Sequence, residues 1–122
     1  MIIGLHALTR FRRGYMKYLV MGTEGPGYFS PEEEVEVLES VVIPAFDELK
    51  DLEDEGTIVG GLPVGDRAFV FVAEADSHDD LDRMLRSLPI WGVLEWEVIP
   101  LQDFEARARQ ERGILKSLKA ES

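Results

Sequence analysis

Two glutamates near the end of the chain have the type and spacing that proton-transfer chemistry requires. Glu95 and Glu97 lie two residues apart in segment 93–101, whose other residues are all uncharged and mostly apolar. Residues two apart in a strand point to the same side of a sheet, so both carboxylates would share one face. A carboxylate in an apolar cleft has a raised pKa and can act as a general acid or base. The alternatives are a solvated rim or an ion pair with Arg67 on another strand.

Three further residues are candidates for substrate binding. Arg67 begins an apolar strand, and its planar guanidinium could bind a substrate carboxylate through two parallel hydrogen bonds. A cross-strand ion pair is the alternative for this arginine. Tyr18 and Trp91 could line an apolar pocket, although aromatic side chains more often pack in a core or a dimer interface.

The sequence lacks the residues that a metal site or a nucleotide-binding site would need. The chain has no cysteine, which excludes a disulfide, a thiolate zinc site and a cysteine nucleophile. Its two histidines, His6 and His78, are isolated and have no ligand spacing around them. No glycine-rich phosphate loop or serine-hydrolase motif occurs. We therefore expect no metal and no cofactor.

The charge of the chain excludes some partners. The formal net charge is -11, and residues 24–55 carry twelve acidic side chains against one basic residue, Lys50. An acidic body repels nucleic acid, and the acidic run itself is typical of a solvated helix face. No apolar run approaches the roughly 18 residues that span a membrane, and the N-terminus lacks the order of a signal peptide. We expect a cytoplasmic protein that binds neither nucleic acid nor membrane.

The periodicity of apolar residues indicates alternating strands and helices in residues 15–122, which we take as one domain. The order is β-α-β-β-α-β with one further helix, the ferredoxin-like form of an α+β fold. Such a fold has a four-stranded antiparallel sheet with two helices on one face. The expected strands are residues 15–21, 57–62, 67–74 and 93–101, and the expected helices are residues 30–56, 77–88 and 103–118.

Local signals support these boundaries. Ser30 is a suitable N-cap for the first helix, and Ser77 with Asp80 forms a capping box at the second. Pro44 should kink or split the long helix, either to bend it around a core or to widen a pocket. The pair Gly60–Gly61 inside a strand indicates a bulge or a close backbone approach.

The strand at residues 67–74 is apolar on both faces. A half-solvated antiparallel strand should alternate apolar and polar residues, and two helices can cover only one face of the sheet. A second copy of the same sheet is the simplest cover for the other face. The pattern therefore predicts a homo-oligomer, as a dimer or a multiple of dimers. The two apolar sets are Phe69, Phe71 and Ala73, and Ala68, Val70 and Val72.

Residues 1–14 precede the domain as an N-terminal extension. Ile3, Leu8 and Phe11 have the spacing of a short amphipathic helix that could dock on a partner subunit. A misassigned start codon is the alternative explanation for this segment.

One long segment and the end of the last strand have the pattern of a known family. They are GGLPVGDRAFVFVAEADSHDDLDRMLRSLPI and WEVIPL, which combine a glycine-containing second strand, the SLPI helix exit and an acid–x–acid–Val–x–Pro–Leu ending. Residues 56–101 thus resemble the muconolactone isomerase family, and Met16 lies where family members usually begin.

The resemblance implies a dimeric α+β barrel, often assembled into rings of dimers. It also implies a cofactor-free shift of a double bond in a small unsaturated lactone acid. Glu95 and Glu97 match acidic positions of the family's last strand, and Arg67 would bind the substrate carboxylate. The family's polar residues at the start of the first helix are replaced here by GTEGPGYFSPEEEVEV. Glu32, Glu34 and Glu36 could take their place or act only as partners of the helix dipole.

Two alternatives remain beside an intramolecular isomerase. The chain could be a non-catalytic, homo-oligomeric partner-binding module that keeps the fold without the site. It could also be a relative in the same barrel superfamily, such as the YCII-like proteins. Those proteins usually have a His–Asp pair in the first half, where this chain has only His6.

Overall fold

The computed structural model describes residues 15–24 and 30–121. The expected amphipathic segment 1–14, with His6, lies outside the described residues. Tyr28 and Phe29, two further aromatic residues of the sequence, also lie outside the described residues.

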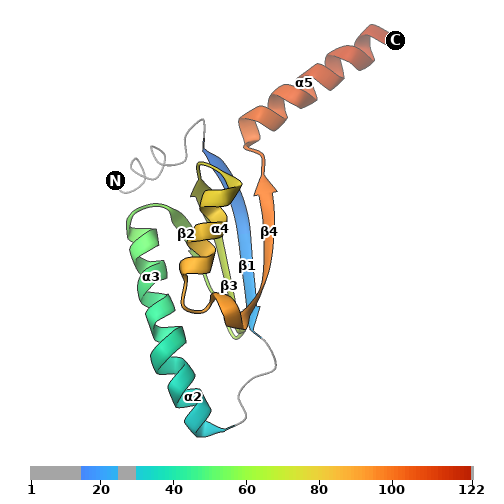
Figure 1. The fold of residues 1–122 in the computed structure, drawn as a ribbon. Coiled ribbons are helices and arrows are strands. Elements are labelled where there is room, and N and C mark those ends of the chain that lie inside the picture. The colour runs from blue at the N-terminus through green and yellow to red at the C-terminus, as the bar shows by residue number, and fades with distance from the viewer. Residues whose placement is uncertain (1–14, 25–29, 122) are drawn as a thin grey trace.

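Four antiparallel strands form one sheet in the order β2-β3-β1-β4 (Figure 1). The sheet pairs β1 with β3 on one side and with β4 on the other, so β1 is an inner strand. This order is that of the ferredoxin-like arrangement, and the predicted α+β fold is confirmed. The strands are β1 (Met16–Glu24), β2 (Ile58–Gly61), β3 (Ala68–Ala75) and β4 (Leu94–Leu101).

Two helical units pack on the sheet, and a third helix projects away from it. The first packed unit is a continuous helical rod at residues 31–54, and the second is α4. Both cover the same face of the sheet (Figure 1). The helical segments are α2 (Pro31–Val37), the π-turn η1 (Leu38–Val42), α3 (Ile43–Asp54), α4 (His78–Ser87), the 3-10 turn η2 (Trp91–Val93) and α5 (Phe104–Glu121).

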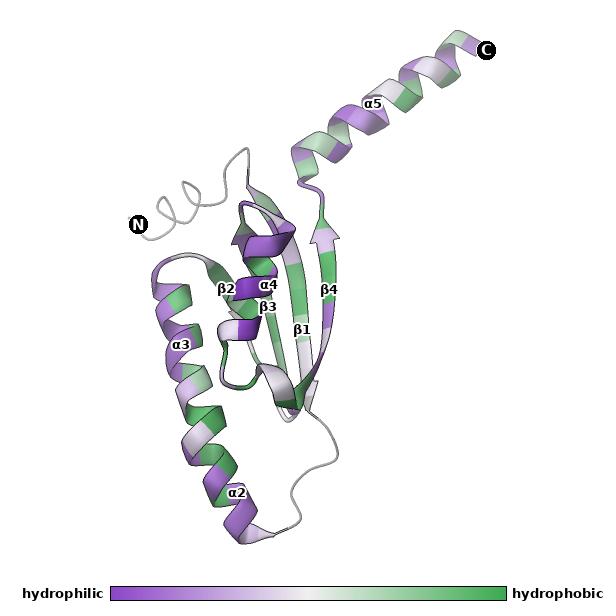
Figure 2. Ribbon diagram, in the orientation of Figure 1, coloured by the Kyte–Doolittle hydropathy of each residue, from purple (hydrophilic) through white to green (hydrophobic). Residues whose placement is uncertain are grey.

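The hydrophobic core lies between the sheet and this helical layer. Apolar residues run along all four strands (Figure 2). Alternate residues of each strand face the helices, and these are the most buried. The core residues include Tyr18 and Val20 of β1, Phe69, Phe71 and Ala73 of β3, Ala45 of α3, and Leu81 and Leu85 of α4.

The long rod contains the irregularity that Pro44 predicts. A proline has no N–H and its ring collides with the carbonyl four residues earlier. Here the preceding turn widens to a π-turn over Leu38–Val42, in which the Ile43 N–H bonds to the Leu38 carbonyl. The helix continues after the proline as α3. Pro44 therefore changes the hydrogen-bond spacing rather than ending the helix.

The capping residues behave as the sequence predicts. The Glu33 N–H donates to the Ser30 hydroxyl at 3.1 Å, and the Asp80 N–H donates to the Ser77 hydroxyl at 3.1 Å. Gly56 ends the rod with a φ of 80°, a conformation that L side chains rarely adopt. β1 extends to Glu24 rather than stopping at residue 21, because it pairs with β3 as far as Thr23 and with β4 as far as Glu24.

α5 is the element that does not join the packed body. It begins after the short linker Gln102–Asp103 at the end of β4 and projects away from the sheet (Figure 1). None of its residues is buried. In the described part of the chain, no helix combines the length and apolarity needed to cross a membrane.

Gly60→Ala should destabilise the fold by about 1–3 kcal/mol, because the added Cβ would overlap backbone that cannot move away. It would meet the Val70 carbonyl and lie 2.5 Å from the Phe71 Cα. Urea unfolding followed by circular dichroism measures the effect. Gly61→Ala is the matched control, since a Cβ there meets no atom within 4 Å. Equal stability of the two variants would contradict this assignment.

Candidate functional site

The candidate acid–base pair lies on the sheet face opposite the helical layer. Glu95 and Glu97 are exposed, and in the register of the sheet they stand opposite Thr23 and Met21. The intervening Trp96 packs against the core. Because side chains alternate along a strand, both carboxylates point away from the helices, with their Cα atoms about 7 Å apart.

The rest of this open face is mostly apolar. The packed helices α3 and α4 both lie on the other side of the sheet (Figure 1). Lys17 and Glu74 stand opposite one another near one end of the face. An apolar surface of this kind is a candidate for contact with another sheet. The side chains assigned to it by alternation include Leu19, Met21, Val70, Val72 and Ile99, all of them half-buried or exposed.

Arg67 lies at the same end of the sheet as Glu95 but points toward the other face. The next residue, Ala68, stands opposite Thr23, which in turn stands opposite Glu95. The arginine itself lines a hollow of about 240 Å³ together with Phe46 and Phe69. β1 separates β3 from β4, so within one chain Arg67 is not a neighbour of the glutamates across a strand pair.

Tyr18 is in the core rather than in an open pocket. Its side chain is only 2% exposed, and its hydroxyl contacts the Nδ1 of His78 at 2.5 Å and the sulfur of Met16 at 3.1 Å. Burial raises the pKa of the Tyr18 hydroxyl, because the charged phenolate is poorly solvated there. The histidine ring meets the tyrosine ring edge to face, with centroids 5.6 Å apart.

The Tyr18–His78 pair was missed by sequence reasoning. The sequence shows His78 only as an isolated histidine, and in the structure it is exposed on the first turn of α4. Nothing in the local sequence shows that this turn lies over the start of β1, sixty residues earlier. The contact exists because β1 and β3 pair along their whole length and α4 follows β3 directly.

Trp91 lies in the turn before β4, half-buried against the core. Its backbone carbonyl accepts a hydrogen bond from the Trp96 Nε1 at 3.0 Å, and the Arg86 guanidinium lies 4.5 Å above its ring. These contacts fasten the turn to the sheet and to α4. Trp91 lies near the C-terminal end of β1, where β4 begins, whereas Tyr18 lies near the N-terminal end of β1. The structure does not bring the two aromatic residues together.

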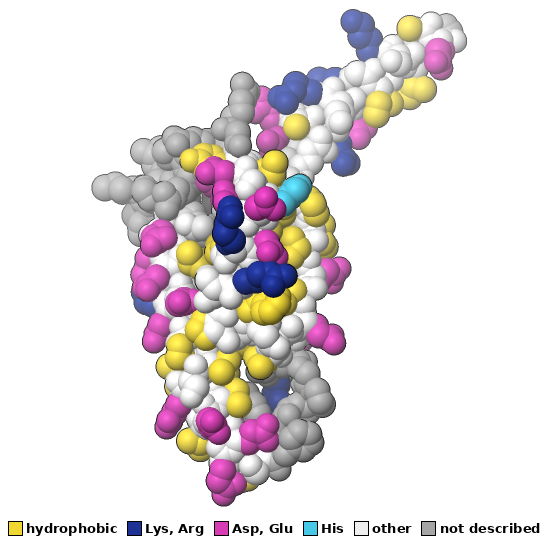
Figure 3. Space-filling model, viewed as in Figure 1, with side chains coloured by type: hydrophobic (Ala, Val, Ile, Leu, Met, Phe, Trp, Pro, Cys, Tyr) yellow, Lys and Arg dark blue, Asp and Glu magenta, His cyan; other side chains and the backbone are white. Residues whose placement is uncertain are grey.

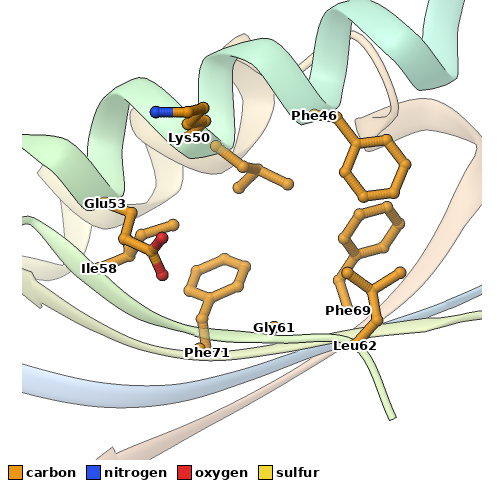
Figure 4. Close-up of a pocket in the computed structure, with 10 residues that line it drawn as sticks. Phe46, Lys50, Glu53, Ile58, Gly61, Leu62, Phe69 and Phe71 are labelled. Atoms are coloured by element: carbon orange, nitrogen blue, oxygen red, sulfur yellow. The ribbon is translucent and has the colours of Figure 1, made fainter. Parts of the chain in front are cut away.

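A second hollow opens between α3 and the edge of the sheet. It has a volume of about 180 Å³ and is lined mainly by apolar side chains, with Lys50 and Glu53 at its border (Figure 4). Phe46 of α3 and Phe69 of β3 face one another with ring centroids 5.3 Å apart. The same two residues also border the Arg67 hollow. The two hollows together form an apolar groove along the rod, which sequence reasoning did not identify.

The described residues contain no cluster of three or more metal-ligating side chains. Glu95 and Glu97 lie on the open face among apolar side chains, whereas Arg67 borders a hollow on the other face. The two carboxylates can transfer protons and the guanidinium can bind an organic anion, but one chain does not bring the three groups together.

Comparison with protein-family models matches residues 16–107 to muconolactone delta-isomerase. The matched span covers the whole sheet and both packed helices. This chain belongs to the muconolactone delta-isomerase family. A comparison with curated proteins finds no match. The family match begins at Met16, the first residue of β1, and ends in the first turn of α5, so most of α5 lies beyond the match.

Tyr18→Phe should reduce stability at neutral pH by about 0.5–1.5 kcal/mol, since it removes the hydrogen bond to His78. It should also change the alkaline limb of the stability curve. Burial raises the folded pKa of Tyr18 above its ordinary value of about 10, so the neutral hydroxyl stabilises the fold below that pH. That contribution is lost as the pH rises through the folded pKa.

Urea unfolding at several pH values from 7 to 11 measures both effects. Above pH 10, the wild-type chain should lose stability more steeply than Tyr18→Phe. Parallel alkaline slopes for the two proteins would show that the tyrosine hydroxyl does not contribute in this way.

Proposed function

We propose that this member of the muconolactone delta-isomerase family binds a small organic acid or lactone on the open sheet face and moves a proton between two of its carbons. The observation that carries the proposal is the pair of exposed carboxylates, Glu95 and Glu97, side by side on an otherwise apolar face. The family match over residues 16–107 supports the reaction class.

The reaction needs a base and an acid, and no oxidant. One carboxylate accepts a proton from a carbon next to the carbonyl or double bond. The electron pair of the broken C–H bond forms a new double bond, and the old double bond takes up a proton at its far carbon. The substrate is neither oxidised nor reduced, so two carboxylates suffice for the proton transfers.

A second copy of the chain would complete the site. Two sheets pack about 10 Å apart, and the glutamates of one face would then lie between apolar strands of both copies. Such a cleft excludes water, which strengthens the electrostatic interactions that stabilise a developing enolate. In this proposal the oligomer is part of the active site.

Arg67 is the proposed residue for the substrate carboxylate. Ala68, Thr23 and Glu95 stand side by side on three neighbouring strands at the end of the sheet. Arg67 directly precedes Ala68 in the chain and therefore lies at the rim next to these residues. A guanidinium at this rim binds an anion as a planar fork, which orients the substrate toward the glutamates. Tyr18 and Trp91 support the strands from the core side and have no direct role in the proposal.

One observation favours a second candidate function, a non-catalytic partner-binding module. α5 lies mostly outside the family match, and it has no buried residue although it carries four exposed large apolar side chains, Phe104, Ile114, Leu115 and Leu118. A protein that has the family's sheet and an additional exposed apolar helix could bind another protein through that helix.

Glu95→Gln combined with Glu97→Gln should lower turnover of muconolactone by at least about 100-fold, the usual contribution of acid–base groups. NMR in deuterated water follows the reaction and detects exchange of the substrate's carbon-bound protons. Because both side chains are exposed, the urea midpoint should not change. Glu48→Gln, at an exposed glutamate of α3, is the matched control and should keep full activity.

Two outcomes would overturn the proposal in different ways. Full activity in the double variant would remove the two glutamates from the mechanism. An inactive wild-type protein that still forms oligomers and neither turns over nor exchanges the substrate would support the partner-binding module instead.

A further inference from the structure

Helix α5, none of whose residues is buried, carries an apolar stripe. Its apolar residues recur at intervals of three, four and seven, which places them along one side of a helix. Phe104 is 96% exposed, Leu115 53% and Leu118 57%, and Ala108 lies in line between them. A stripe of this size on an otherwise charged helix indicates a surface that packs against something.

The charge of α5 is opposite to that of the long rod. α5 carries five basic and three acidic residues, whereas the rod at residues 31–54 carries ten acidic residues and only Lys50 as a base. Acidic side chains are spread over α2 and α3, and basic side chains project from α5 (Figure 3). The two elements are therefore electrostatically complementary.

The rod also borders an apolar groove that could receive the stripe. Leu38 and Phe46 on the rod and Leu62 at the end of β2 are all exposed, and they line the same hollow as Glu34. α5 has 18 residues and is about 27 Å long at 1.5 Å per residue, so it fits along a rod of residues 31–54.

α5 cannot lie along the rod of its own chain. Only Gln102 and Asp103 connect it to β4, a linker that spans about 7–10 Å when extended. β4 is at one edge of the sheet and β2, beside α3, is at the other, about 14 Å away. α4 lies between them on the helical face (Figure 1).

We propose that α5 docks on a second copy of this chain. Its apolar stripe lies in the groove between the rod and β2 of the second copy, and its basic residues face that copy's acidic helices. The contact covers the hydrophobic side chains that each chain leaves exposed at both places. It uses the helical face of the sheet rather than the open face that bears Glu95 and Glu97, although Arg67, which the proposed function uses, borders the same groove.

Site-specific cross-linking in a mixed-isotope sample tests this docking. The native chain has no cysteine, so a benzophenone maleimide attaches only at Leu115→Cys in the full-length protein. The probe-carrying protein has natural isotope abundance. It is mixed with wild-type protein that carries no probe and is uniformly enriched in nitrogen-15. After illumination, mass spectrometry identifies which chain and which peptide the probe has reached. We expect cross-links to nitrogen-15 peptides from residues 31–62.

The controls keep each outcome decisive. Ser117→Cys places the probe two residues further on, on the opposite side of α5, and should give a severalfold lower yield to that segment. Leu118→Cys, one turn along the stripe, should reproduce the Leu115 result. Three results would each overturn the proposal. They are cross-links found only within the probe-carrying chain, cross-links to other surfaces of the nitrogen-15 chain, and no cross-links at all.

Discussion

The structure depends on a sheet whose two faces are both apolar and whose helices can cover only one of them. Phe69, Phe71 and Ala73 of β3 point into the helical layer and are buried. Val70 and Val72 alternate with them and point the other way, where they are only half-buried. The core, the position of the glutamates and the expected self-association all follow from this alternation. A strand of this composition on a half-solvated sheet would leave apolar area in water.

The inner position of β1 sets the geometry of the candidate site. It separates Arg67 at the start of β3 from Glu95 and Glu97 on β4, so these groups meet only around the end of the sheet or through a second copy. It also places Tyr18 under the first turn of α4, where the hydroxyl contacts His78. At the other edge, Gly60 lets β2 approach the backbone of β3 closely, and the groove beside α3 opens there.

Sequence reasoning predicted the order of the elements because its signals are local. Ser30, Ser77 and Gly56 mark helix ends through hydrogen bonds or dihedral angles within a few residues, and the alternation in β3 and β4 fixes which residues share a face. The family resemblance read from residues 56–101 agrees with the match over residues 16–107. The arrangement of the glutamates on one face follows from the same alternation.

The features that sequence reasoning missed depend on contacts between distant segments. The Tyr18–His78 pair requires the register of two strands and the start of a helix, none of which a single segment shows. The groove between α3 and β2 requires the packing of the rod against the sheet edge. The irregularity predicted at Pro44 takes the form of a π-turn over Leu38–Val42 that separates α2 from α3, and this form depends on the preceding turn rather than on the proline alone. The apolar periodicity of residues 103–118 predicts a helix there, but it does not show that none of the residues of α5 is buried.

The central claim is that the open sheet face pairs with a second copy, and native mass spectrometry of the purified full-length protein tests it most directly. The account predicts a dimer or a multiple of dimers at micromolar concentration. It also predicts that Val72→Asp, which adds a charge to the open face, lowers the order of the assembly, while Asp82→Asn on the exposed side of α4 does not. A wild-type protein that is monomeric under these conditions would contradict the account.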